Sequence, residues 1–533
     1  MPLKYALRGA ALGWGQHAGV SRRAKGATLS LRAYRVYKDI PAPPASHHVT
    51  KSIVCFRHGD RSASHNLFEP ESELAVQEAL AWSLELPTKA QEKQLHQLAP
   101  VERTENTLLP RDAELGVFGK LTVRGIEQAQ KLGEWLRRQY IAKKTLPRPN
   151  QEVITCYSSN YSRTIMSAQS VLQAMLGRTL LDGNKVKVKV CSQEHEFINV
   201  YPFLQRLQKL MYDAANRADG PIVSADNAMV ATRDALSNML PAFSFNLRRF
   251  SWLTFQDHYH CRLGRTWPHA AAAESTPISR IKSLFDESDV GNDTYLTKSE
   301  TRQLLRKLSD YVTDEDCDKI FETMDTNDNE IVTYEEFVAF CQKGFPLVGA
   351  LDKEEAMWSS RGAVERHVVK RFEAWYGSEE ILHHAIGRLV RRINTILLDD
   401  GDSEQSNIVH NTGALDSTTR VTLVSGHDIT VMPLLYAVGD WKEGEDDWPN
   451  YTSTVVFELL EPTGTGKAPE DEEPLEVGTK YVRGFYYPGV LSESGKAGDI
   501  HVREIMFGDD EGDHPLGTRR KHVPLADFVN LLG

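Results

Sequence analysis

The chain has 533 residues, of which 41% are hydrophobic and 25% charged, and these values indicate a globular protein with two or more modules. Its formal net charge of −11 and the absence of a lysine-rich stripe with interleaved aromatics argue against nucleic acid as a partner. No uninterrupted apolar run reaches membrane-spanning length, and the six cysteines lack the C-x-x-C spacing of a zinc site, although disulfides among them stay open.

The first 38 residues contain eight Lys or Arg and no acid, the first acid being Asp39. A basic leader without acids is typical of a mitochondrial transit peptide, so we expect residues 1–48 to be such a leader and the protein to be mitochondrial. The alternatives are a secretory signal, or a disordered basic tail on a cytoplasmic protein.

The apolar run 52–56 predicts a buried strand that ends in Arg57-His58-Gly59-Asp60-Arg61. Two guanidinium groups can neutralise phosphoryl oxygens, and an imidazole beside them can act as a nucleophile. We expect Gly59 to bend the backbone and to let a phosphate approach closely. The motif by itself could also be a surface turn.

Two further strands end in polar side chains. The run 154–159 leads to Arg163, and the run 421–425 leads to His427 and Asp428. The carboxyl ends of parallel strands share one edge, so these residues should meet the first motif in one crevice. The alternatives are a helix-start salt bridge for Arg163, a structural histidine at 427 and a helix N-cap at 428.

Amphipathic helices at 123–140 and 381–397 alternate with the strands and predict an α/β core of three layers. Residues 200–270 should form a cap over the strand ends. Segments 452–460 and 480–487 should form a late hairpin.

Two twelve-residue loops, 289–300 and 325–336, follow each other 36 positions apart, each with an acid at position 1, Thr at 9 and Glu at 12. This spacing supplies the oxygens that calcium needs, so the segment 275–348 resembles a paired EF-hand, an inserted all-α module. The predicted calcium ligands are Asp289, Asp293, Tyr295, Thr297 and Glu300 in the first loop, and Asp325, Asn327, Asn329, Ile331, Thr333 and Glu336 in the second.

Leu296 and Val332 should pair across the two loops. Position 6, which usually carries Gly, is Thr294 in one loop and Glu330 in the other, and a side chain there costs about 1–3 kcal/mol of backbone strain. Weak binding, or a structural module without calcium, is therefore the alternative.

The chain resembles the histidine acid phosphatase branch of the histidine phosphatase superfamily over most of residues 50–270 and 350–533. The order of the motifs is that of the branch: the motif at 57–61, then Arg163, then His427-Asp428. Segments 427–435, 448–449 and 457–459 are most similar to the type 6 acid phosphatases that act on lysophosphatidic acid. The resemblance implies a phosphatase core with its first part and cap at 49–270 and its second part at 350–533.

The resemblance also implies a mechanism. His58 would attack phosphorus and become a phosphohistidine, while Asp428 would protonate the leaving alkoxide and then help to activate water. The phosphoryl oxygens would be held by Arg57, Arg61, Arg163 and His427.

The expected activity is that of an acid phosphatase for phosphate monoesters, with lysophosphatidic acid or a similar lipid phosphate as substrate. The alternatives are an inositol phosphate or phosphosugar phosphatase, and a calcium-binding regulatory protein with an inactive phosphatase domain. Calcium would stand outside the phosphatase chemistry. Because its module enters through the cap, we hypothesise that the ion alters substrate access, with plain stabilisation of the cap as the alternative.

Overall fold

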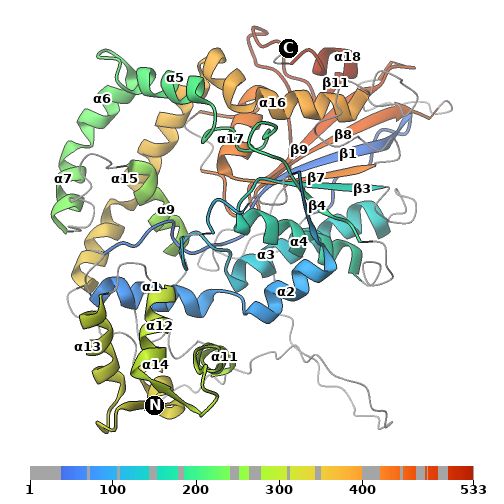
Figure 1. Cartoon of the computed structure of the whole chain (residues 1–533). Helices are drawn as coiled ribbons and strands as arrows, with labels where there is room; N and C mark the ends of the chain where they lie inside the picture. Colours follow the sequence, from blue (N-terminus) through green and yellow to red (C-terminus); the bar gives the residue numbers. More distant parts are fainter. Residues whose placement is uncertain are drawn as a thin grey trace, which may run out of the picture.

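The computed structural model of the chain is shown in Figure 1. It describes residues 38–68, 73–104, 109–113, 115–142, 153–177, 185–239, 251–262, 278–308, 313–342, 350–398, 420–443, 448–463, 475–476, 478–489 and 502–531. The leader prediction rests on residues 1–48, and most of that segment lies outside the described residues.

Among these described residues, one mixed sheet of nine strands forms the centre, in the order β10-β9-β8-β1-β7-β3-β4-β2, with β11 also paired to β9. Strands β1, β7, β3, β4 and β2 run parallel, and β8 joins β1 antiparallel. The bounds are β1 His47–Arg57, β2 Val101–Arg103, β3 Ile154–Ser158, β4 Val188–Val190, β7 Val421–Gly426, β8 Thr454–Pro462, β9 Tyr481–Tyr487, β10 Arg503–Glu504 and β11 His522–Pro524. The predicted late hairpin is the pair β8–β9.

The side chains of β1 alternate between two cores, as the pleat of a strand requires. Val54 and Phe56 belong to the core beneath α3 and α4, whereas Ile53 and Cys55 belong to the core on the opposite face, beneath α16 and α17. Figure 1 shows the sheet between these two helical layers. The layer helices are α2 (Lys89–Leu98), α3 (Val123–Leu136), continued by the short π-helix η1 (Arg137–Ala142), α4 (Ser162–Leu176), α16 (Glu379–Leu398), α17 (Asp428–Ala437) and α18 (Leu525–Phe528). The prediction of an α/β core of three layers is confirmed.

A group of helices lies beside the sheet, at the end to which β1 runs (Figure 1). They are α1 (Glu73–Glu85), α5 (Gln205–Ala215), α6 (Pro221–Ala228), α7 (Val230–Met239), α9 (Trp252–Arg262) and α15 (Ala350–Tyr376). Helix α9 packs on α15, since the Tyr259 and Ser360 hydroxyls are 3.3 Å apart and the Trp252 ring meets the His367 ring edge-on.

Two helix–loop–helix units occupy the segment for which calcium loops were predicted. They consist of α11 (Ile278–Ser288), β5 (Tyr295–Thr297), α12 (Lys298–Leu308), α13 (Asp314–Met324), β6 (Ile331–Thr333) and α14 (Tyr334–Gln342). Strands β5 and β6 are antiparallel with Leu296 opposite Val332, which confirms that pairing. Thr294 and Glu330 adopt the left-handed conformation, with φ of 73° and 63°, as expected at position 6.

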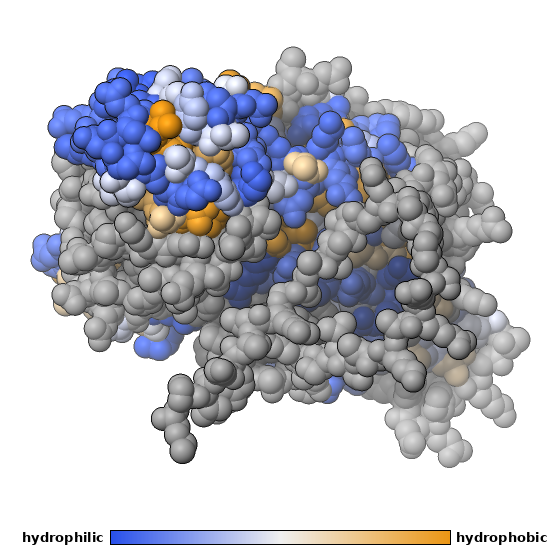
Figure 2. All heavy atoms as spheres, turned by 90° about the horizontal axis from the view of Figure 1, so that it is seen from below, coloured by the Kyte–Doolittle hydropathy of each residue, from blue (hydrophilic) through white to orange (hydrophobic). Residues whose placement is uncertain are grey.

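The apolar side chains of this helix–loop–helix module form a core with residues of the larger domain. Leu296 and Val332 share one buried cluster with Ala63, Trp82 and Cys261. Figure 2 views the molecule from the side on which the module lies, and hydrophilic residues dominate the coloured surface. The helix–loop–helix module therefore packs on the larger domain through its apolar side chains.

None of the described helices is long and apolar enough to cross a membrane. All six cysteines are buried free thiols, so none of them forms a disulfide in this structure.

Candidate active site

The predicted phosphate-site residues come together where three parallel strands end at the same level. Arg57 at the end of β1 lies opposite Gly426 of β7, and Ser425 lies opposite Ser158 of β3. The backbone N–H of His58 also donates to the carbonyl of Gly426 at 3.0 Å. The register of the sheet thus sets the loops after β1, β3 and β7 side by side.

His58 is held as a neutral imidazole with one free ring nitrogen. Its Nδ1 lies 2.7 Å from the carbonyl oxygen of Gly59, and because a carbonyl only accepts, Nδ1 carries the proton and Nε2 keeps its lone pair. Burial, together with the charges of Arg163 and Arg57, holds the pKa of His58 well below its usual value. The side chain is therefore unprotonated and nucleophilic at neutral and mildly acidic pH.

Arg57, the last residue of β1, is almost completely buried. Its Nη2 pairs with Asp428 at 2.8 Å, and its Nη1 donates to the carbonyl of Pro449 and to Nε2 of His260 at 3.1 Å. The guanidinium also lies 4.5 Å from the ring centroid of Tyr451. These contacts fix its plane before any ligand arrives.

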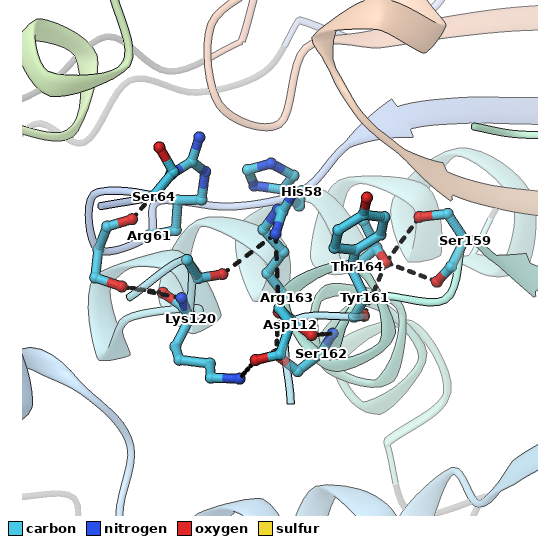
Figure 3. A network of polar contacts seen from close by, with 12 residues as sticks. His58, Arg61, Ser64, Asp112, Lys120, Ser159, Tyr161, Ser162, Arg163 and Thr164 are labelled. Carbon is cyan, nitrogen blue, oxygen red and sulfur yellow. Dashed lines mark hydrogen bonds and ion pairs between the residues drawn. The ribbon is translucent and has the colours of Figure 1, made fainter. Parts of the chain in front are cut away.

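Arg163, the second residue of α4, reaches toward His58 with Asp112 and Lys120 on its other side (Figure 3). Its Nη1 lies 3.8 Å from the Asp112 carboxylate, and its guanidinium lies 4.3 Å from the ring centroid of Tyr161. Arg163 thus does form an ion pair at a helix start, but with its side chain only 14% exposed the pair is buried and not on the surface, and the charge of Arg163 lowers the pKa of His58.

His427 and Asp428 begin helix α17, and the N-cap is His427, so the alternative that placed the cap at Asp428 is wrong. The His427 Nε2 lies 2.9 Å from the Ser159 hydroxyl. Asp428 accepts hydrogen bonds from Trp448 Nε1 at 3.2 Å and from the Ile429 backbone at 2.8 Å. With 20% of its side chain exposed, against 2% for Arg57, Asp428 is the member of the pair that a leaving group can reach.

Arg57, Arg61 and Arg163 share two further properties. Each has a carboxylate partner, and the Nε–H of each is buried without a hydrogen-bond partner in the described part of the chain. A buried donor left unpaired is costly, and the oxygens of a phosphoryl group would satisfy such donors. The three partners are Asp428, Asp257 and Asp112.

Gly59 has a packing role that the sequence did not predict. The residue has no left-handed backbone, and the space beside it is taken by protein, because a Cβ on Gly59 would lie 2.2 Å from the carbonyl oxygen of Gly125 in α3. The glycine allows the catalytic loop to pack on α3. Its backbone N–H donates to the Ser167 hydroxyl of α4 at 3.0 Å.

Sequence reasoning missed four residues of the site: Asp112, Asp257, His260 and Tyr451. None of them follows an apolar strand, which was the signal that led to the others. Tyr451 sits two residues after Pro449, and its ring centroid lies 5.9 Å from that of His58.

The predicted calcium ligands lie in the two loops of the helix–loop–helix module. The Asp289 carboxylate accepts from the backbone of Asp293 and Thr294 at 3.1 and 2.9 Å, and Glu300 accepts from Thr297 and Gly291, both at 2.9 Å. In the second loop Asp325 and Glu336 form the corresponding bonds. The remaining predicted ligands, Tyr295, Asn327, Asn329, Ile331 and Thr333, lie between these loop ends or in β5 and β6.

Within the described ranges, no three His, Cys, Asp or Glu side chains converge on a point that suits a metal ion. In both loops the carboxylates at the first and last positions accept hydrogen bonds from the backbone of the same loop.

The sequence model described as "Histidine phosphatase superfamily (branch 2)" matches residues 48–486. A comparison with curated proteins found no match. Among solved structures, the apo form of Hafnia alvei phytase is 12% identical with a TM-score of 0.43, over 92% of this chain and 97% of that one. The Bifidobacterium longum multiple inositol polyphosphate phosphatase with phosphate is 13% identical with a TM-score of 0.45, over 94% and 97%. Likeness at this level does not identify a substrate.

Proposed function

Because the chain belongs to branch 2 of the histidine phosphatase superfamily and is a phosphatase, we propose that it hydrolyses phosphate monoesters through a phosphohistidine on His58. The observation that carries this proposal is the neutral His58, with its proton fixed on Nδ1 and three arginines around it. An inactive phosphatase domain is not supported, since the expected catalytic residues are all present.

The two steps follow from the contacts. Nε2 of His58 forms a bond to phosphorus while the bond from phosphorus to the leaving oxygen breaks. Asp428, which takes up a proton when the phosphate anion binds beside it, passes that proton to the leaving oxygen. Water then attacks the phosphohistidine, gives its proton to Asp428, and releases His58 and phosphate. The arginines neutralise the charge on the equatorial oxygens throughout.

Replacement of His58 by Ala tests the proposal directly. We expect the hydrolysis of p-nitrophenyl phosphate to fall by on the order of 10³-fold or more, because the covalent route is lost. Wild-type enzyme mixed with radiolabelled substrate and quenched in alkali should carry the label, and the His58→Ala protein should not. Hydrolysis that survives the substitution would contradict the mechanism.

For the substrate, we keep lysophosphatidic acid as one proposal. Asp428, which meets the leaving group, is bonded to Trp448, and the Trp448 ring packs at 5.0 Å on Phe372. Aromatic side chains beside the acid favour a leaving group with apolar surface.

An inositol phosphate or phosphosugar is the second proposal, since the two similar structures described above are a phytase and a multiple inositol polyphosphate phosphatase. Lys120 adds a cation beside Arg163. Burial lowers the pKa of Lys120, Asp112 raises it and Arg163 lowers it further, with a net lowering. A polyanion needs such extra cations. Hydrolysis rates of the wild type and of the Lys120→Met and Trp448→Ala variants, measured on both substrates, decide between the two classes. A loss with Lys120→Met that is confined to inositol hexakisphosphate supports the inositol phosphate. A loss with Trp448→Ala that is confined to lysophosphatidic acid supports the lipid phosphate.

We also propose calcium binding by the helix–loop–helix module. The left-handed residues Asn292, Thr294, Asp328 and Glu330 give both loops the closed shape that the spacing of the predicted ligands requires. Asp289, Glu300, Asp325 and Glu336 would supply the carboxylates, and the bound ion would act on the fold and not in the phosphoryl transfer.

The test of calcium has two readouts. Calorimetric titration should show heat of binding that disappears in a Glu300→Gln, Glu336→Gln double variant. If the ion controls substrate access, phosphatase turnover should differ between calcium and chelator, and equal rates would contradict that hypothesis. Thermal unfolding with calcium and with chelator then measures whether the ion stabilises the cap.

A further inference from the structure

Helix α9 contributes three side chains to the phosphate site from outside the sheet. Asp257, His260 and Cys261 lie at i, i+3 and i+4 and so share one face of the helix. Asp257 contacts Arg61, His260 contacts Arg57, and the Cys261 sulfur lies 3.7 Å from Arg61 Nη1 and 3.3 Å from the Tyr451 hydroxyl. One helix face thus touches two of the three arginines.

The contact between Asp257 and Arg61 is a two-point pair. Oδ1 accepts from Nη2 of Arg61 and Oδ2 accepts from Nη1 at 3.2 Å. Oδ2 also accepts from the backbone N–H of Ser64 at 2.9 Å, three residues after Arg61. The carboxylate therefore fixes both the guanidinium and the loop that carries it. Both side chains are only 10% exposed, so water competes weakly for these bonds.

The pair leaves one edge of Arg61 for a ligand. Its two terminal nitrogens are used by Asp257, whereas its Nε–H is buried without a partner among the described residues. Burial by itself would lower the pKa of Arg61, but the charge of Asp257 raises it well above the usual value. Asp257 thus orients the guanidinium without covering its Nε–H edge.

Helix α9 is itself held on both sides. Arg262 at its end forms an ion pair with Glu78 of α1, and both side chains are at most 1% exposed. Tyr259 and Trp252 contact α15. A carboxylate on such a helix has little freedom, which is what a residue that positions another must have.

From these contacts we propose that Asp257 is a positioning residue for the phosphatase reaction, which holds Arg61 with its Nε–H edge toward the phosphoryl group. His260 on the same helix face helps to hold Arg57, since its Nε2 accepts a hydrogen bond from Arg57 Nη1. The proposal rests on the proposed function, in which Arg61 binds the transferred phosphoryl group.

Asp257→Asn keeps the size of the side chain and removes its charge, so it is the main test. Loss of the pair should misplace Arg61 and lower kcat/KM for p-nitrophenyl phosphate by about 10–100-fold, with a weaker competitive inhibition by inorganic phosphate. The matched control is Asp527→Asn in α18. Its carboxylate pairs with Arg520 at 2.9 Å and, within the described residues, contacts neither α9 nor the three arginines, so the substitution should leave both values unchanged.

An effect through Arg61 is separated from a general structural effect by a double-mutant cycle. In an Arg61→Ala background, Asp257→Asn should cause almost no further loss of kcat/KM. A similar loss in both backgrounds would overturn the proposal, and so would wild-type kinetics and phosphate inhibition for Asp257→Asn.

Phosphate affinity measured by calorimetry on His58→Ala and on His58→Ala, Asp257→Asn gives a readout that needs no chemistry. A drop of about tenfold in affinity supports the positioning role even if the nucleophile has been assigned wrongly. Equal affinities of the two proteins would refute the positioning role while leaving the phosphohistidine mechanism in place.

Discussion

Gly59 lies in the catalytic loop, next to His58, and packs on helix α3. Because it has no side chain, the carbonyl of Gly125, 66 positions later, can approach its backbone closely. Residue identity at position 59 is therefore set by packing on α3. The motif 57–61 could be found from the sequence because an apolar run precedes it, but the contact with α3 could not, because no local pattern marks the approach of two backbones.

Gly59→Ala should lower both stability and activity. The added Cβ would overlap the Gly125 carbonyl, and overpacking of this kind costs about 1–3 kcal/mol and moves the loop that carries His58. Urea unfolding and turnover of p-nitrophenyl phosphate measure the two effects.

The control for this variant is Gly387→Ala in α16, where the nearest heavy atom to an added Cβ is at 3.5 Å. A helical Gly→Ala change without overlap should stabilise by up to about 1 kcal/mol. If both variants behave alike, the close contact at Gly59 does not govern the loop.

At the scale of elements, the strands were predictable and the helix that supports the site was not. Strands β1, β3 and β7 are apolar runs that end in polar residues, a pattern visible in the sequence. Helix α9 carries Asp257 and His260 on a segment whose residues are buried nearly all round, so periodicity gives no hint of which face meets the arginines.

The ion pair between Glu78 and Arg262 joins α1, which packs on the helix–loop–helix module, to α9, which packs on the arginines. Glu78 also accepts from Trp82 Nε1 at 3.1 Å and from the Leu67 backbone at 2.6 Å. Glu78→Gln should therefore destabilise the fold by about 3–5 kcal/mol, because it removes the negative member of a fully buried ion pair.

Unfolding in urea, followed by circular dichroism, measures that loss. The surface pair of Glu102 with Lys187, about 45% exposed on both sides, provides the control, and Glu102→Gln should change stability by less than about 1 kcal/mol. Equal effects of the two substitutions would show that the buried pair does not hold the elements together.

For the whole molecule, four buried histidines make stability depend on pH. Burial first, and then nearby arginines, hold the pKa values of His58, His258, His260 and His427 well below the usual value. In the unfolded chain these groups protonate near pH 6.5, so between that pH and their folded pKa values the unfolded state binds more protons.

Stability should therefore fall as the pH drops below about 6.5, by up to about 1.4 kcal/mol per pH unit for each histidine. Glu196, whose pKa burial raises to about 7, acts in the opposite direction but is one group against four. Urea midpoints at pH 7 and pH 5 measure the net effect, and His258→Gln should make the dependence shallower. A stability that rises toward pH 5 would contradict the protonation states assigned to the site.

The position of β1 in the sheet has a consequence for how the protein is made. Figure 1 shows this early strand between β7 and β8, whose residues begin at Val421 and Thr454. Since a ribosome releases the chain from its N-terminus, an apolar strand that carries the nucleophile must wait for both neighbours until most of the protein has been translated. The helix–loop–helix module contains its own contacts between nearby residues and can fold during that interval. Assembly of the active site is thus among the last events of folding, although its first residues are among the first to emerge.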